Sequence, residues 1–475
     1  MITAGDGWSL AATLLVALWV MAGWRPVGSF RRSTPAPWTW TAFLGASAGL
    51  LMSGLGLALL SGLGVRWSSG AVWSLAALLA IPGVLALAAS RRRRRADPAS
   101  TASTASSLSS FLRRVHPADA VAAAVAAGAT LLFAAASALR MNVHADYVYH
   151  WGQKAARYAL EGGVDVEFLA APWNAYLHPD YPSLLPALHA AAFNAAGGIG
   201  WPVTAVIATL FFALLPASLF ALVEASSSDA RPEGRCLAFT VATLGAVAFA
   251  VGFRQAGGAD VAMAAAMTAA VCAAVRPATR GSDLDVAVIA ALLAAVKLEG
   301  LPAAACLVGA HVVRRAIAEP GARLRTAFVA ALRSSGPAAV AVGLWAWLTF
   351  GNGLFLESNT AAFRLDRLPT VLAGLGQTAL LPDWWGLPLA LVALPALLAV
   401  RRLRWGAALL LVQLAFYVYS YAAGPVDTAH WIATSAARLL FHLVPAAVVL
   451  AIIAADRWAA APVAPQVPRA PSGDV

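Results

Sequence analysis

Apolar residues run in long blocks along this chain, and charged residues stand in short groups between the blocks. Most blocks approach the length of about 20 residues that a helix needs to cross a hydrocarbon core about 30 Å thick. The pattern predicts an all-α protein, a polytopic bundle of about 11 to 13 transmembrane helices. We expect spans at residues 7–24, 39–63, 71–89, 118–139, 201–223, 236–252, 261–275, 336–350, 384–400, 406–421 and 438–455.

The apolar run 286–313 is too long for one untilted span, and a charged, helix-breaking stretch interrupts it. Lys297, Glu299 and Gly300 lie in this interruption. Such residues are tolerated at mid-membrane depth only inside the protein or beside a water-filled cavity. We expect the run to enter the membrane and return as a hairpin, because the five arginines between 314 and 333 then all stay cytoplasmic.

The distribution of charge supports a membrane location and predicts an orientation. Charged residues make up 12% of the chain and hydrophobic residues 60%, whereas soluble domains carry about 25% charged residues. Arginines gather in short groups between spans, at 31–32, 91–95, 314–315 and 401–402, as they do in cytoplasmic loops. This predicts an outside N-terminus and an inside C-terminus. The net charge of +11 therefore reflects the arginines of the cytoplasmic loops of a membrane protein, and nucleic-acid binding is not expected.

Composition divides the chain into four parts. Residues 1–95 hold N-terminal transmembrane segments, and 96–117 form a Ser/Thr/Ala-rich cytoplasmic linker. Residues 118–455 form the main membrane domain, in which 140–182 is a large structured loop on the extracytoplasmic side. Residues 456–475 are rich in proline and alanine and are expected to be a disordered cytoplasmic tail.

The loop 140–182 brings charged, histidine and aromatic residues together just above the membrane. Asp146 follows the end of a transmembrane helix by a few residues, so its carboxylate would lie at head-group level and could act as a general base. The alternative is an acid that only ends the helix. Lys154 is one of two lysines beside 31 arginines, and its compact ammonium suits a phosphate oxygen. The alternative for Lys154 is a snorkelling cation at the interface.

A proline-bounded turn closes the loop. In His-Pro-Asp-Tyr-Pro at 178–182, the prolines restrict the backbone, so the turn presents His178 and Asp180 near the interface, unless it is only a turn. The segment 183–198 is expected to be a helix at the membrane surface. A divalent metal site in the loop is a further interpretation, although the spacing of its histidines and aspartates matches no specific ligand pattern. The groups concerned are His144, His150 and His178 with Asp146 and Asp180.

Further candidates lie beyond the loop. Asp260 stands in a short outward turn between two spans. Lys297 and Glu299 are ionisable residues inside the membrane, which are functional candidates by default, although they could simply pair with each other. Arg438 and His442 lie one helical turn apart, and together they could hold a lipid phosphate, unless Arg438 only anchors a helix end.

The order of these motifs resembles the GT-C superfamily of polyprenyl-phosphate-dependent glycosyltransferases. The likeness is nearest to the bacterial branch of protein O-mannosyltransferases and aminoarabinose transferases, and it covers about 118–455. Its five motifs are H-A-D-Y-V-Y-H-W around Asp146, H-P-D-Y-P at the loop end, G-A-D-V-A-M around Asp260, V-K-L-E-G-L around Lys297, and R-L-L-F-H-L-V-P from Arg438.

The resemblance implies an enzyme that transfers a sugar from a polyprenyl-phosphate donor to a glycan, lipid or protein acceptor. It implies a bacterial plasma membrane location with the active site facing outward. Asp146 and Asp260 would be catalytic. The donor phosphate or substrate would be bound by Lys154, His178, Asp180, Lys297, Glu299, Arg438 and His442.

The resemblance also leaves points open. No cofactor follows from it with certainty, because metal dependence varies in the superfamily. Asp180 stands where the mannosyltransferases have a second proline, so a protein acceptor is not implied. The rival interpretations are an O-antigen-type ligase or polymerase and a lipid or sugar transporter or flippase. A transporter would place charges at mid-membrane in several helices, whereas Lys297 and Glu299 lie together.

Overall fold

The computed structural model describes residues 10–30, 38–96, 116–227, 230–252, 257–354, 362–381, 387–424 and 427–460. Every regular element in these ranges is a helix, which confirms the all-α prediction. The longer helices are α1 (Leu10–Phe30), α2 (Trp38–Gly62), α3 (Ser69–Ala96), α5 (Pro117–Arg140), α9 (Trp201–Ser226), α10 (Pro232–Gly252), α11 (Ala259–Val275), α12 (Ser282–Val296), α13 (Gly300–Ala318), α14 (Arg323–Phe350), α15 (Leu368–Ala379), α16 (Leu387–Leu397), α17 (Arg404–Ala423), α18 (Thr428–Phe441) and α19 (Val444–Ala460).

The helices are those of a multi-pass membrane protein. Among the described residues, seven helices are long and apolar enough to cross a membrane, and the bent pair α18–α19 makes an eighth if it is one span. The prediction of 11 to 13 spans is larger, because it also counts segments such as α11 and α16. These have 17 and 11 residues, fewer than the ~20 that an untilted span needs.

The predicted hairpin over 286–313 is present as α12 and α13. Asp283 in the first turn of α12 accepts a hydrogen bond of 2.8 Å from the Nε2 atom of His311, near the end of α13. The two helices therefore run in opposite directions, with Lys297 and Glu299 at the tip between them. We call the end of the bundle that carries residues 141–182 the loop side, and the end that carries 314–333 the arginine side.

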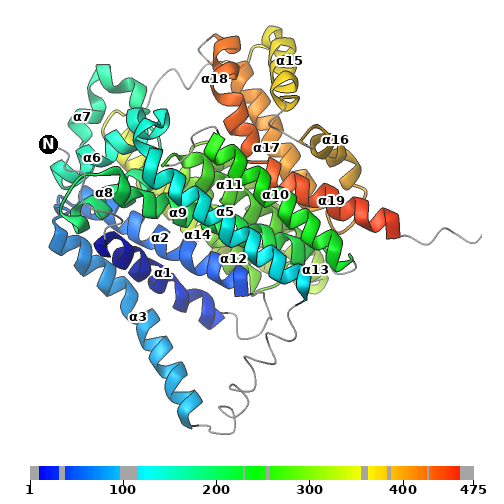
Figure 1. Cartoon of the computed structure of the whole chain (residues 1–475), viewed down its shortest axis with the longest axis horizontal. Coiled ribbons are helices and arrows are strands. Elements are labelled where there is room, and N and C mark those ends of the chain that lie inside the picture. Colours follow the sequence, from blue (N-terminus) through cyan, green and yellow to red (C-terminus); the bar gives the residue numbers. More distant parts are fainter. Residues whose placement is uncertain are drawn as a thin grey trace, which may run out of the picture.

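The loop 140–182 folds into short helices on the loop side, left of the bundle in Figure 1. They are η1 (Met141–Val143), the π-turn η2 (Tyr147–Trp151), α6 (Gly152–Glu161), α7 (Val166–Ala170) and η3 (Pro172–Leu177). The next helix, α8 (Leu184–Ala196), was expected to lie at the membrane surface, and in the structure it packs inside the protein. Ten successive residues of α8 are buried beneath α6 and against α1 and α2, because every side chain of α8 except His189 and Asn194 is apolar.

The first three helices pack against the remainder of the protein. The Trp40 indole donates to Asp285 of α12 at 2.8 Å, and the backbone N–H of Val164 in the loop donates to Ser61 Oγ at 2.8 Å. Helices α1 and α2 pack backbone against backbone, because a Cβ atom on Gly49 would lie 1.7 Å from the Trp19 carbonyl oxygen. Residues 97–115 of the linker and 461–475 of the tail lie outside the described residues.

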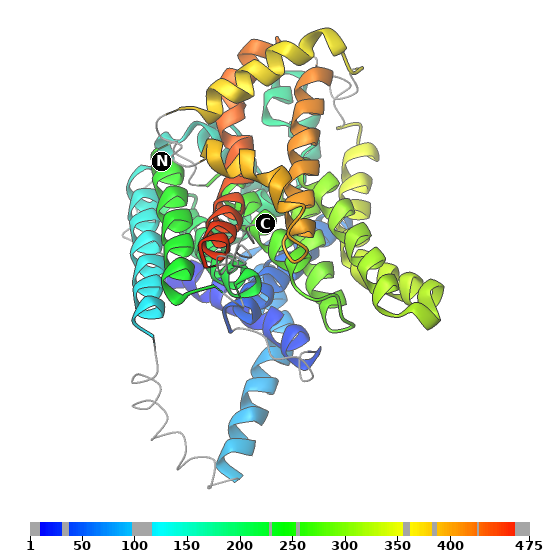
Figure 2. The same ribbon diagram turned by 90° about the vertical axis from the view of Figure 1, so that its right-hand side faces the viewer.

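Helix α3 extends away from the bundle at the bottom of Figures 1 and 2, on the arginine side. At the opposite end, α15 packs against α18 at the top of both views. The predicted span 438–455 is not one straight helix, because α18 and α19 meet at a bend of 51°. Pro445 explains the break, since it has no N–H to bond the carbonyl of Phe441.

Candidate active site

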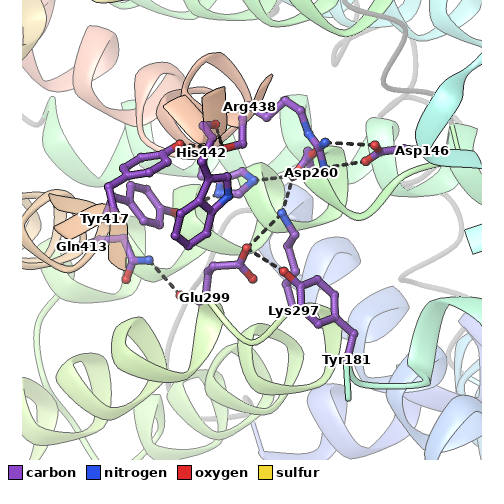
Figure 3. A network of polar contacts seen from close by, with 12 residues as sticks. Asp146, Tyr181, Asp260, Lys297, Glu299, Gln413, Tyr417, Arg438 and His442 are labelled. Carbon is purple, nitrogen blue, oxygen red and sulfur yellow. Dashed lines mark hydrogen bonds and ion pairs between the residues drawn. The ribbon is translucent and has the colours of Figure 1, made fainter. Parts of the chain in front are cut away.

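Side chains from four separate parts of the chain meet in one polar network on the loop side (Figure 3). Asp146 precedes η2, and Asp260 lies in the first turn of α11. The break between α12 and α13 brings Lys297 and Glu299. Because α18 ends where Pro445 interrupts the helix, Arg438 and His442 lie at that end. The network is thus made of these six predicted residues: Asp146, Asp260, Lys297, Glu299, Arg438 and His442.

Asp260 is the centre of the network and is fully buried. Its Oδ1 atom accepts from Lys297 Nζ at 2.9 Å, and its Oδ2 atom accepts from Arg438 Nε at 2.8 Å. The Nε2 atom of His442 lies 2.9 Å from Oδ1. A buried carboxylate without such partners would cost several kcal/mol, so these contacts are what keep Asp260 ionised inside the bundle.

Arg438 connects Asp260 to Asp146. Its NH1 atom donates to Asp146 Oδ1 at 2.9 Å, and NH2 lies 2.5 Å from Asp146 Oδ2, so the guanidinium and the carboxylate form a close ion pair with one hydrogen bond. The side chain of Arg438 is 26% exposed and that of Asp146 13%, whereas Asp260 has no exposed surface. The network therefore reaches the protein surface at the Asp146–Arg438 pair, and also at Glu299, whose side chain is 17% exposed.

The hairpin tip supplies the second half of the network. Glu299 Oε1 lies 3.3 Å from Lys297 Nζ and accepts a hydrogen bond of 3.3 Å from the Tyr181 hydroxyl. The Gln413 amide donates to the Glu299 carbonyl at 2.8 Å, which fastens the tip to α17. These bonds fix where Lys297 stands relative to Asp260.

Tyr417 orients His442. The Tyr417 hydroxyl lies 2.8 Å from His442 Nδ1. If the hydroxyl donates to Nδ1, the proton of the neutral imidazole is on Nε2, which can then donate to Asp260. The histidine is thereby held as a donor toward the central carboxylate.

Lys154, His178 and Asp180 form a separate cluster beside the network. Lys154 is buried, donates to the His178 carbonyl at 3.3 Å and lies 4.6 Å above the Trp151 ring. Asp180 is buried, and its carbonyl accepts from the Trp345 indole at 2.6 Å. Lys154 and Asp180 thus hold the proline turn from inside, whereas the His178 side chain is exposed. They join the network only indirectly, because Tyr181 of that turn bonds Glu299.

Burial sets the acid–base properties of the loop. It raises the pKa of the Asp146 carboxyl above its ordinary value, and the charge of Arg438 opposes this. It lowers the pKa of Lys154 to about 7, against the charge of Asp180. A carboxylate with a raised pKa is a better proton acceptor near neutral pH, which is the property a general base needs.

The metal site left open by the sequence does not form. In the described ranges no group of three or more His, Cys, Asp and Glu side chains could hold a metal ion. Asp146 is bound by Arg438, and Asp180 lies near Lys154, so the two carboxylates do not converge with the loop histidines.

No family model, curated protein or solved structure matches this chain.

Sequence reasoning missed the tyrosines and the glutamine that position the network. Gln413, Tyr417 and Tyr421 recur every four residues in α17, so they lie on one face of an otherwise apolar helix. A polar stripe in an apolar span is a signal that could have identified them. Tyr181 was within the proline turn, but nothing in its spacing indicated that it would reach Glu299.

Proposed function

We propose that this protein is a membrane glycosyltransferase that moves a sugar from a polyprenyl-phosphate donor to an acceptor on the extracytoplasmic side of a bacterial plasma membrane. The observation that carries the proposal is the partly exposed Asp146–Arg438 pair at the edge of a buried charge network. It combines a proton acceptor and a phosphate-binding cation at one point. The arginine-rich opposite end supports the orientation, with the loop side outward.

The proposed reaction separates the roles of the two partners. The polyprenyl chain lies in the bilayer, and Arg438 exchanges part of its pairing with Asp146 for two oxygens of the carrier phosphate. Asp146 then takes the proton of the acceptor nucleophile. The nucleophile bonds to the anomeric carbon as the bond from that carbon to the phosphate oxygen breaks, with inversion. The electron pair leaves on the lipid phosphate.

The buried part of the network prepares this step. Lys297 and Arg438 place two positive charges beside Asp260 before any donor binds. Preorganised cations stabilise charge that develops on a leaving phosphate, because they need no rearrangement during the reaction. Asp260 and His442 hold Arg438 and Lys297 in place, and Glu299 holds the hairpin tip. Lys154, His178 and Asp180 support the loop end that would border the substrate.

A transporter or flippase is the second candidate, because one observation favours it. The charged break between α12 and α13 resembles the interrupted helices that line substrate sites in transporters. Such a protein would move a lipid-linked sugar without breaking its bond to phosphate.

The test is a reconstituted assay with two readouts. The protein in vesicles is given radiolabelled polyprenyl-phosphate sugars together with a glycan and lipid extract. Our proposal predicts labelled acceptor and free polyprenyl phosphate. Movement of intact donor between leaflets, with no labelled acceptor from any donor, would instead identify a transporter and contradict the enzyme.

A further inference from the structure

A large hollow lies in the loop, outside the charge network. It has a volume of about 700 Å³, and segments of α6, α7 and η3 line it. Ligand pockets range over about 300–1,000 Å³, so the hollow is large enough for a molecule of several rings. The hollow is lined by α7, which lies at the same end of the molecule as α15 and α18 in Figure 1 and opposite the tip of α3. It is therefore on the side where the proposed acceptor approaches.

The wall of the hollow is polar and fixed in place. Arg157 donates to Asp165 Oδ2 through Nε at 3.1 Å and NH2 at 2.5 Å, and its guanidinium lies 4.7 Å from the Phe168 ring. Asp165 also caps α7 by accepting from the Phe168 N–H at 2.9 Å. The Asn174 amide donates to the Phe168 carbonyl at 2.7 Å. The site thus exists before a ligand arrives, and its charged wall does not suit a lipid chain.

A row of aromatic rings leads from the hollow toward Asp146. Trp173 lines the hollow and is 76% exposed, and Tyr176 is 46% exposed. They are three residues apart in the 3-10 helix η3, where residues i and i+3 lie on one face. The Tyr176 ring is 6.5 Å from the His150 ring, and the Tyr176 hydroxyl donates to Gln153 at 3.1 Å. His150 stands one turn after Asp146.

The surroundings identify the class of ligand. The flat C–H faces of a pyranose ring stack on exposed aromatic rings, while its hydroxyl groups donate to carboxylates and accept from a guanidinium. Glu161, Asp165 and Glu167 outnumber Arg157 in the wall, which disfavours an acidic ligand. A tryptophan this exposed at the far edge of the loop also has no role in the core.

We propose that the hollow and the row Trp173–Tyr176–His150 form the binding track of an oligosaccharide acceptor without acidic groups. The track holds the acceptor chain in the hollow and along the rings, so that its end reaches Asp146. This proposal rests on the proposed function for its direction, because the end at Asp146 is where transfer occurs. The binding of a saccharide to the track does not depend on it.

The distance favours a chain of several sugars. Arg157 follows Asp146 by eleven residues in nearly continuous helix, which corresponds to roughly 16 Å at 1.5 Å per residue. A single sugar cannot occupy both ends. Affinity is therefore expected to increase from disaccharide to hexasaccharide.

The test measures binding to the full-length protein in nanodiscs by calorimetry. The probes are cellohexaose, mannohexaose, a chitosan hexamer and, as the acidic counterpart, a hexamer of galacturonic acid. We expect at least one of the first three to bind, more tightly than its disaccharide, and the acidic hexamer to bind more weakly. Trp173→Ala weakens binding by about tenfold or more, and Trp173→Ala with Tyr176→Ala abolishes it.

Two controls make the result decisive. Trp38→Ala removes a tryptophan of the same exposure, 77%, far from the track in sequence and on the arginine side, and leaves binding unchanged. Asp366→Asn, which removes an exposed carboxylate outside the track, also keeps the affinity within about twofold. No binding of any hexasaccharide by the wild type, or equal affinities for Trp173→Ala and Trp38→Ala, overturns the track. Binding that depends on Trp173 without any transfer overturns the proposed function and keeps the track.

Discussion

Arg438 is shared between two carboxylates, and this explains how one network combines a buried and an accessible part. Its Nε atom faces Asp260, while its two terminal nitrogens face Asp146. A lysine could not make both contacts, because an ammonium lacks the planar fork of the guanidinium. Asp146 is therefore paired with Arg438, a cation that a phosphate group can also bind.

The pH dependence of transfer follows from Asp146. Burial raises the pKa of this carboxyl from its ordinary 3.8, and a general base is active only when it is deprotonated. Activity is therefore present above the raised pKa and is lost as the pH falls through it. We expect the acidic limb of kcat/KM to lie above the pH of an ordinary aspartate. A rate that stays constant down to about pH 4 would contradict a buried carboxylate base.

Single residues were the easiest part of the site to find from the sequence, and their partners were the hardest. Isolated charges in apolar surroundings, such as Asp260 and Lys297, stand out because burying them is costly. Their pairing joins residues up to 292 positions apart, as between Asp146 and Arg438, and no local spacing encodes it. Lys154 was a candidate for phosphate binding or for a snorkelling cation, yet α6 turns it inward against Trp151.

Among the elements, the hairpin α12–α13 has the most direct effect on the site. Its base is held by Asp283, which bonds His311 at 2.8 Å and lies 3.6 Å from Arg315. Its tip delivers Lys297 and Glu299. The reversal was predictable, because charge and glycine interrupt an overlong apolar run. The break between α18 and α19 was not predicted, although Pro445 marks it.

Substitution of Gly300 tests whether the position of the hairpin tip matters for the reaction. A Cβ atom at Gly300 would lie 2.0 Å from the Leu293 carbonyl oxygen, so Gly300→Ala must displace the tip. A displacement of about 1 Å in a catalytic group can reduce the rate about 10²-fold, and we expect a loss of that order in transfer. Gly309→Ala in the same helix is the control, because nothing lies within 4 Å of a Cβ there. If the two variants transfer sugar at the same rate, the tip position does not matter for the reaction.

At the scale of the whole molecule, the two ends of the bundle differ. The loop side carries the network and the folded loop, whereas the arginine side carries the hairpin base and the exposed arginines of α14. The class of the fold was predictable, since apolar blocks dictate helices in a bilayer. The burial of α8 was not, because an apolar helix of 13 residues is equally compatible with a membrane surface and a protein interior.

The orientation can be measured by labelling cysteines. Cys236, Cys272 and Cys306 are unpaired and are first replaced by alanine. Glu167 on the loop side and Arg325 on the arginine side are both exposed. A single cysteine at 167 should react with a membrane-impermeant maleimide on intact cells, and one at 325 only after permeabilisation. The reverse pattern would place the network in the cytoplasm and contradict the proposed outward site.

The central claim, that Asp146 is the base of a glycosyl transfer, is tested most directly by the transfer rate of Asp146→Asn with a radiolabelled polyprenyl-phosphate sugar. Asp366→Asn serves as the matched control, since it removes an exposed carboxylate that pairs with Arg364. We predict a rate about 10²–10⁴-fold below that of the wild type for Asp146→Asn, in a protein that elutes as a folded monodisperse species, and no change for the control. Equal rates for the wild type and Asp146→Asn would contradict the account.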